Sequence, residues 1–228
     1  MFRQWRLRRR CRTLARNCGQ GSLKSYIEDC PGVQIDKLAN TPLIAVDLEL
    51  TGLDPKQNKI IAIGWTKIDH GRIRFGANRH ILVNADQSVG HSAAIHELTD
   101  SEVASGVPLK SGLKALFKAA RGRVWLFHHA GLDVAFLKQA CLAWAGLTPP
   151  FAMLDTMHME LMMRKRRDLP MRQGDLQLAT LRARYNLPRY TAHNALIDAF
   201  ATAELMLAIA AKMDTGNSIR LQPHMKYF

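Results

Sequence analysis

A short apolar run that ends in two carboxylates constrains this chain more than any other stretch. Residues Leu43–Val46 are all apolar, and the segment is bounded by Pro42 before it and by a turn around Gly52 after it. This pattern predicts a buried strand. Asp47 and Glu49 follow directly. Side chains two residues apart on a strand point to the same side, so both carboxylates converge on one small volume.

Two neighbouring carboxylates repel each other, and burying an unpaired one is costly. A protonated partner, a basic side chain or a divalent cation would offset that cost. Residues 42–52 contain no Lys or Arg. A metal ion is therefore a specific hypothesis, although an isolated Asp-x-Glu is also typical of an exposed strand end. Further acidic ligands must come from elsewhere in the chain.

The composition is that of a globular protein with a basic balance of charge. Hydrophobic residues make up 47% of the 228 residues and charged residues 22%, which fits one domain with a terminal appendage. The formal net charge of +13 favours a polyanionic partner, either nucleic acid or an anionic membrane surface. No apolar run reaches the roughly 18 residues that a membrane-spanning helix needs.

The four cysteines fit no metal-binding framework. They form no Cys-x-x-Cys pair and have no histidine at zinc-finger spacing. Reduced thiols are usual in the cytoplasm, so we expect a cytoplasmic protein, and a disulfide among the three N-terminal cysteines stays an alternative. The four are Cys11, Cys18, Cys30 and Cys141.

Residues 1–40 differ from the rest and predict a basic N-terminal helical extension. The stretch from Arg3 to Arg16 holds seven arginines, and no acidic residue precedes Glu28. An organelle transit peptide is one interpretation, but hydroxyl residues are few and no cleavage pattern is clear. A helix that lies on the domain or touches nucleic acid fits better, and a solvated helical face without a partner stays equally open.

The strand pattern predicts a mixed sheet. Lys59–Asp69 and Arg72–Val83 are expected to form two more strands on either side of a turn, so the first three strands make an antiparallel meander. Arg123–His128 and Phe151–Leu154 are expected to be short strands that alternate with helices. The order indicates an α/β fold in which three antiparallel strands are extended by parallel strands and flanked by helices.

Helices are expected where apolar residues recur at helical spacing. Residues 84–98 are expected to be a loop and 99–102 a capped helix start, while the basic cluster Arg164–Arg167 is placed in a loop. We assign the domain to 41–212 and leave 213–228 as a tail without organised pattern. The expected helices cover residues 109–120, 133–145, 155–163, 176–185 and 195–212.

Two more acids are placed where a structural role explains them poorly. Asp133 follows the fourth strand, at the edge where open α/β sheets gather ligands, although it would also serve as a helix N-cap. Asp198 lies in an otherwise apolar helix, where a buried carboxylate must meet a compensating charge. His193 is expected on the loop that enters this helix, and an imidazole beside a metal site is a natural general base. A cap or a satisfied surface histidine is the alternative.

Four acids and a histidine match two-metal phosphoryl chemistry. Two divalent ions roughly 3.5 to 4 Å apart can activate a water, stabilise the charge on phosphorus and assist the leaving oxygen. Oxygen ligands favour Mg²⁺ or Mn²⁺ over zinc. The basic charge of the chain agrees with a nucleic acid substrate.

Three segments of this sequence resemble the ordered motifs of the DEDDh 3′-5′ exonucleases, the family that includes the proofreading epsilon subunit of bacterial DNA polymerase III. They are Asp47-Leu48-Glu49-Leu50-Thr51-Gly52, His128-His129-Ala130-Gly131-Leu132-Asp133 and His193-Asn194-Ala195-Leu196-Ile197-Asp198-Ala199. Each motif is weak alone, and their order, spacing and context carry the resemblance, which covers about residues 41–212.

The resemblance implies a ribonuclease H-like fold and release of nucleoside 5′-monophosphates from a 3′ end of DNA. By motif, Asp47, Glu49, Asp133 and Asp198 would hold two Mg²⁺ or Mn²⁺ ions, and His193 would deprotonate the attacking water. The implied partners are single-stranded or frayed 3′ ends and an associated DNA polymerase.

The resemblance also marks candidate substrate contacts. Thr51 lies in the first motif, and His96 lies in a segment similar to the family's loop between sheet and first helix. Two residues depart from the family pattern: Leu50 stands where the family often has Thr, and His129 stands where it often has Asn. Both lie near the expected position of the terminal nucleotide, so they bear on substrate preference.

Two other functions stay open at this point. The first keeps the chemistry and changes the substrate to RNA or short oligonucleotides, because recognition of the 2′-hydroxyl depends on pocket geometry. The second is a nucleic-acid-binding or polymerase-associated module whose catalytic site has decayed, and the presence of all four acids and the histidine argues against it.

Overall fold

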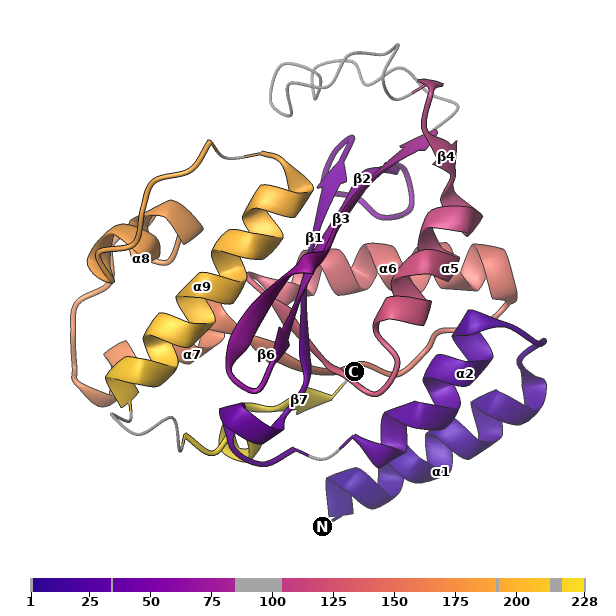
Figure 1. The fold of residues 1–228 in the computed structure, drawn as a ribbon, viewed down its shortest axis with the longest axis horizontal. Coiled ribbons are helices and arrows are strands. Elements are labelled where there is room, and N and C mark those ends of the chain that lie inside the picture. Colours follow the sequence, from indigo (N-terminus) through magenta and orange to yellow (C-terminus); the bar gives the residue numbers. More distant parts are fainter. Residues whose placement is uncertain (1, 34, 85–103, 192, 214–218, 228) are drawn as a thin grey trace.

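The chain forms one mixed sheet with helices on both faces (Figure 1). The computed structural model describes residues 2–33, 35–84, 104–191, 193–213 and 219–227. Within them the sheet has seven strands in the order β4-β3-β2-β1-β5-β6-β7. The strands are β1 Leu43–Leu50, β2 Ile60–Asp69, β3 Arg72–Asn84, β4 Val107–Pro108, β5 Val124–Phe127, β6 Ala152–Asp155 and β7 Lys226–Tyr227.

The pairing confirms the predicted mixed sheet. The strands β1, β2 and β3 pair antiparallel, and β5 and β6 extend the sheet in parallel from β1. Two short edge strands were not expected: β4 pairs parallel with β3, and β7 pairs antiparallel with β6. Both edges carry only two paired residues, too short for a period of alternating side chains to identify them.

The helices divide between the two faces of the sheet (Figure 1). On one face α1, α2, α5 and α6 share a core with Ile44 and Val46 of β1, and on the other face α7, α8 and α9 pack with Leu43 and Ala45. Alternate residues of β1 therefore enter different cores. The helices are α1 Phe2–Asn17, α2 Ser22–Asp29, α5 Leu109–Ala119, α6 Ala130–Ala145, α7 Thr156–Arg166, α8 Leu178–Arg184 and α9 Ala195–Met213.

The N-terminal segment is helical, as expected, and it shares the main core. Cys11 and Cys18 of the α1 region are buried in the cluster formed with α2, α5 and α6. Tyr26 of α2 is fully enclosed: its hydroxyl accepts a hydrogen bond from Trp125 Nε1 at 2.9 Å and donates one to the Pro150 carbonyl at 2.6 Å. All four cysteines are free thiols and buried, so the alternative of an N-terminal disulfide is wrong.

Three local expectations are corrected. Arg164–Arg166 form the last turn of α7 instead of a loop, where positive charge stabilises the helix C-terminus. The helix α6 begins at Ala130, so Asp133 lies in its first turn and is not the N-cap. Strand β1 runs beyond the expected Leu43–Val46 to Leu50, and both carboxylates belong to it, as their predicted shared face required.

The prediction of an unorganised tail is wrong for residues 219–227. Ile219 and Leu221 are buried in the core beneath α9, and β7 closes the edge of the sheet. Ile219, Leu221 and Met225 are the buried residues that anchor this segment in the core, and their spacing follows neither a helical nor a strand period, so the sequence pattern did not reveal it. The expected loop 84–98 and helix start 99–102 lie almost wholly outside the described residues. No described helix is long and apolar enough to cross a membrane.

Gly64 lets α9 lie directly on the sheet. Gly64 of β2 pairs with Asp47 of β1, and a Cβ atom at Gly64 would lie 2.0 Å from the carbonyl carbon of Ala195, the first residue of α9. Backbone atoms cannot yield to such a contact without moving the helix. A residue without a side chain at position 64 therefore fixes where α9 begins relative to Asp47.

We predict that Gly64→Ala destabilises the protein by about 3 kcal/mol or more, because overpacking against a backbone forces the helix to shift. Gly76→Ala is the matched control, since a Cβ at Gly76 of β3 meets nothing within 4 Å. Urea unfolding followed by circular dichroism measures both. Equal stability of the two variants would contradict the close packing of α9 on β2.

Candidate active site

The first two carboxylates of the site come from the second half of β1. Asp47 and Glu49 lie on the face that α9 covers, because odd-numbered residues of β1 point toward that helix. Glu49 is buried, and Asp47 is partly exposed. The prediction that these two side chains share one face is confirmed.

The third carboxylate is held at the start of α9. Asn194 caps this helix, because its side-chain oxygen accepts hydrogen bonds from the backbone N–H groups of Leu196 and Ile197 at 3.1 and 3.2 Å. Asp198 lies in the first turn, and its Oδ2 accepts a hydrogen bond from the backbone N–H of His193 at 2.8 Å. The capped helix start and the preceding loop together hold the Asp198 side chain in position.

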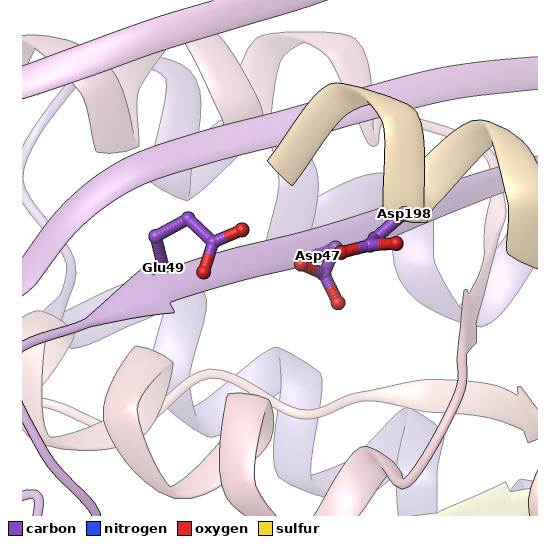
Figure 2. Close-up of side chains that lie close together, drawn as sticks. All are labelled: Asp47, Glu49 and Asp198. Carbon is purple, nitrogen blue, oxygen red and sulfur yellow. The ribbon is translucent and has the colours of Figure 1, made fainter. Parts of the chain in front are cut away.

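These three carboxylates converge from two elements. Ligand oxygens of Asp47, Glu49 and Asp198 all lie within 4.8 Å of one another. Figure 2 shows Asp47 and Asp198 pointing toward each other from β1 and α9, with Glu49 further along the strand. Residues separated by about 150 positions in the sequence therefore form one acidic cluster.

Asp133 lies beside this cluster on α6 and is not one of the three converging residues. Strand β5 pairs with β1 only as far as Ala45, so beyond that residue β1 is paired on its β2 edge alone, and the Leu48 backbone is left to hydrogen-bond Asp133. The pKa of Asp133 is raised to about 8, because the effect of burial outweighs the opposing effect of a hydrogen bond from the Leu48 backbone. The charge of Asp133 also contributes to raising the pKa of Asp47.

Burial and mutual repulsion raise the pKa values of two carboxylates in the cluster, Asp47 and Asp198. Burial raises the pKa of Asp47 well above its usual value, and repulsion from Asp133, Glu49 and Asp198 raises it further. Burial likewise raises the pKa of Asp198, while the hydrogen bond from the His193 backbone lowers it. Positive charge placed among these groups would relieve the repulsion.

The residues present fit a divalent cation. Three carboxylates on convergent elements supply oxygen ligands within reach of one ion, and Asp133 supplies a fourth acid beside Asp47. Oxygen-only donors suit Mg²⁺ or Mn²⁺ better than zinc. None of the cysteines belongs to the cluster.

His193 lies on the loop before α9, where it was expected. Its backbone has a positive φ of 69°, and its side chain is exposed. The imidazole is close enough for its charge to lower the pKa of Asp198. His193 is thus tied to the acidic cluster through its backbone while its side chain faces solvent.

A buried polar network holds the second motif in place. Burial lowers the pKa of His128 to about 4, so its ring is neutral at pH 7. Nε2 donates to the Leu176 carbonyl at 2.9 Å, and Nδ1 accepts from the Thr156 hydroxyl at 2.8 Å. Asp155 Oδ1 accepts from the backbone N–H groups of His129 and His158, both at 3.2 Å. These bonds fix the start of α6, which carries Asp133.

The predicted substrate contacts lie in different surroundings. Leu50 is 7% exposed and packs into the core on the opposite face from the carboxylates. The Thr51 hydroxyl accepts a hydrogen bond from the Lys59 backbone at 2.9 Å. His129 is exposed at the start of α6 with a positive φ of 70°. His96 lies outside the described residues, and contact of all four with substrate stays a prediction.

Two residues that shape the site were missed from the sequence. Gly64 sets the approach of α9, and Asn194 caps it. Asn directly before an apolar helix is a recognisable N-cap signal, so Asn194 could have been found. Gly64 could not, because its role depends on a helix that begins more than a hundred residues later.

The mixed sheet flanked by helices is a ribonuclease H-like fold, and three carboxylates gather at its central strand β1. The chain belongs to the exonuclease family (RNase_T), whose model matches residues 44–206. The matched range contains all four acids and His193. The predicted family is therefore confirmed.

Named proteins support the same assignment. A DNA polymerase III subunit epsilon-like protein from Rhodobacter capsulatus is 30% identical over 75% of this chain, and the match spans 25% of that relative's length. Exonuclease X in complex with 5′-overhanging duplex DNA has a TM-score of 0.59 at 22% identity, covering 80% of this chain and 97% of exonuclease X.

A third protein extends the structural comparison. S. pombe Pop2p in its Mg²⁺- and Mn²⁺-bound form has a TM-score of 0.61 at 15% identity, covering 81% of this chain and 88% of Pop2p. At these identities the two solved structures establish the fold, and they confirm the predicted ribonuclease H-like architecture.

We predict that metal-free protein loses stability as the pH rises from about 4 to about 8. Asp133 titrates near 3.9 in the unfolded chain and at about 8 in the folded protein, so ionisation favours unfolding across that interval. Mg²⁺ or Mn²⁺ binds the ionised form, so the rise in Tm on adding metal should grow over the same interval. Thermal unfolding with EDTA or with metal measures this.

Asp47→Asn provides the control for that experiment. Without metal at about pH 8 the variant should be more stable than the wild type, because it removes one charge from a repulsive cluster. When metal is added, the Tm of the variant should rise less than that of the wild type. A Tm rise equal to that of the wild type would exclude Asp47 as a ligand.

Proposed function

We propose that this protein is a metal-dependent exonuclease that removes nucleotides from the 3′ end of DNA and releases nucleoside 5′-monophosphates. The observation that carries the proposal is the convergence of Asp47, Glu49 and Asp198 beside Asp133. The 3′-5′ polarity rests on the three motifs that resemble the DEDDh exonucleases. Membership of the exonuclease family supports hydrolysis from an end.

Asp47, Glu49 and Asp198 would hold divalent metal, with Asp133 next to Asp47. When bound, two such ions lower the pKa of a water, stabilise charge on phosphorus and assist the leaving 3′ oxygen. The protein contributes the arrangement of the ligands. Two come from one strand, and the third is fixed by the capped start of α9.

His193 is the proposed general base. The hydrogen bond from its backbone to Asp198 keeps the residue beside the acidic cluster, and the exposed imidazole is able to take the proton of the attacking water at a ring nitrogen. The solvent-facing position also lets that proton pass to bulk water.

DNA is the proposed substrate, and a DNA polymerase is the proposed partner. The epsilon-like relative and the DNA complex of exonuclease X favour these choices over RNA. Recognition of RNA would require contacts to the 2′-hydroxyl. The intact set of acids argues against a decayed, non-catalytic module.

We predict that the wild type shortens 5′-labelled single-stranded DNA to a ladder of labelled products when Mg²⁺ or Mn²⁺ is present, and not with EDTA. Asp47→Ala and Asp198→Ala should abolish the ladder, because each removes a ligand from the cluster. Labelled duplex DNA and RNA run in parallel compare the substrates. Release of labelled mononucleotide at the earliest times would instead indicate the opposite polarity.

His193→Gln is expected to lower kcat by about 10² to 10⁴, the range found for loss of a general base. His70→Gln is the matched control, since His70 is also exposed with a positive φ. Gel-based single-turnover digestion measures both. Full activity of His193→Gln would exclude the proposed base while leaving the metal ligands in place.

We also propose that the arginine face of α1 binds the phosphate backbone of nucleic acid. Arg8, Arg12 and Arg16 are exposed, while a different face of α1 packs into the core through Cys11. Figure 1 places α1 well away from the start of α9, so this face would contact the strand or duplex beyond the terminal nucleotides.

Changing Arg8, Arg12 and Arg16 together to Gln should weaken binding of oligonucleotides and reduce the salt dependence by roughly 0.7 in slope for each phosphate that is no longer neutralised. The control changes Lys110, Lys114 and Lys118 of α5 to Gln and removes the same charge. Fluorescence anisotropy over a salt series compares them. Equal weakening in both variants would show that net charge acts without a specific surface.

A further inference from the structure

Three aromatic rings gather beside the start of α9 without a role in the acidic cluster. The ring centroids of Phe75 of β3 and Phe200 of α9 lie 5.2 Å apart, and those of Tyr190 and Phe200 lie 6.1 Å apart. Phe75 is 70% exposed and Tyr190 is 40% exposed. Large aromatic side chains exposed together are uncommon on a protein that has no partner for them.

The irregular pairing of β3 with β2 places Phe75 at this position. Trp65 pairs with Arg79 and Lys67 with Arg74, so one residue of β2 faces residues 75–78 of β3. These extra residues form a bulge, which re-aims side chains out of the regular ladder. Asn78 is tied down by a hydrogen bond from the Thr66 hydroxyl at 2.5 Å. The bulge is therefore a fixed feature that turns Phe75 toward α9.

Buried Arg182 packs its guanidinium over one face of the Tyr190 ring. Its guanidinium lies 4.5 Å from the centroid of the Tyr190 ring and pairs with Glu204 at 2.8 Å. The same side chain donates to the carbonyls of Ala201 and Pro188 at 2.7 and 2.9 Å. The segment that carries Tyr190 is thereby fastened to α9. A ring held in this way loses little conformational freedom when a ligand stacks on it.

The aromatic hollow joins the active site through shared residues. Phe75, Asn78, Leu196 and Phe200 line a hollow of about 490 Å³, together with Arg189 and Tyr190. Arg189 and Tyr190 also line a second hollow of about 680 Å³, which reaches Asp198. Asp198 and Phe200 are two residues apart on α9, so their side chains leave the helix on different sides, and Arg189 and Tyr190 are the residues that connect the two hollows.

The charge of the hollow fits a nucleic acid strand. Among the described residues that line it none is acidic, Arg189 is exposed at its rim, and the nearby Glu204 is neutralised by Arg182. Proteins that bind single strands combine a basic path for the backbone with aromatic rings on which bases stack. The ring faces beside Arg189 match that combination, and Arg189 and Tyr190 connect them to the hollow that reaches Asp198.

We infer that Phe75, Phe200 and Tyr190, with Arg189, form a stacking subsite for bases of the single strand upstream of the scissile 3′ end. This inference rests on the proposed function and specifies which residues would hold the substrate strand. Stacking on rings is tolerant of sequence, because every base offers a π face. The subsite would hold the strand without selecting its sequence.

Equilibrium binding of fluorescent oligothymidylate to the full chain in EDTA tests the subsite directly. Phe75→Ala should weaken binding by roughly tenfold, as expected for loss of one base–aromatic stack. Phe75→Trp should restore the affinity and Phe75→Leu should not, because Leu keeps the apolar contact without the ring. Leu142→Ala on α6 removes an apolar side chain that is 48% exposed and should change nothing.

A set of oligonucleotides with one abasic position moved along the strand locates the stacked base. At one position the abasic substitution and Phe75→Ala should not be additive, because both remove the same contact. Unchanged affinity in Phe75→Ala, or additive effects at every position, would overturn the subsite and leave the rings to another partner such as a protein.

Hydrolysis of the p-nitrophenyl ester of thymidine 5′-monophosphate separates this inference from the proposed function. The ester has no upstream nucleotides, so Phe75→Ala should cleave it like the wild type while its KM for oligothymidylate rises. If the wild type cleaves neither substrate, the proposed function fails. If it cleaves both and Phe75→Ala matches it on both, the subsite fails alone.

Discussion

Repulsion among closely spaced carboxylates is the interaction that most constrains the rest of the structure. Asp47, Glu49 and Asp198 have ligand oxygens within 4.8 Å of one another, and Asp133 adds a fourth charge beside Asp47. Burial and mutual repulsion raise the pKa of Asp47 well above its usual value. A fold that tolerates this repulsion keeps the carboxylates assembled, so the proposed cation would find its oxygen ligands already in place.

The backbone around the cluster keeps those charges together in spite of their repulsion. Gly64 admits α9 to the surface of β2, and Asn194 begins the helix at the position that brings Asp198 to Asp47. On the other side, Asp155 fixes the backbone at the start of α6. The positions of the acids thus depend on backbone contacts, which are much stiffer than the side chains themselves.

The two proposed binding surfaces would hold different parts of a nucleic acid strand. The aromatic rings of Phe75, Phe200 and Tyr190 lie on the flank of α9, the helix that carries Asp198, and the arginine face of α1 lies well away from the start of that helix. Stacking depends on short-range contact, whereas phosphate binding acts over about a Debye length. The two surfaces therefore suit different parts of a nucleic acid, the terminal single strand and the more distant backbone.

The sequence by itself determined the sheet order of the first three strands, the shared face of Asp47 and Glu49, the family and the loop position of His193. These follow from periodicity and from motifs a few residues long, which are local properties of the chain. The tertiary structure alone decided that residues 219–227 complete the sheet and that a bulge in β3 turns Phe75 toward Phe200. Each of these depends on contacts between distant segments, and no short sequence pattern encodes such contacts because they arise only when the faces of the sheet are packed.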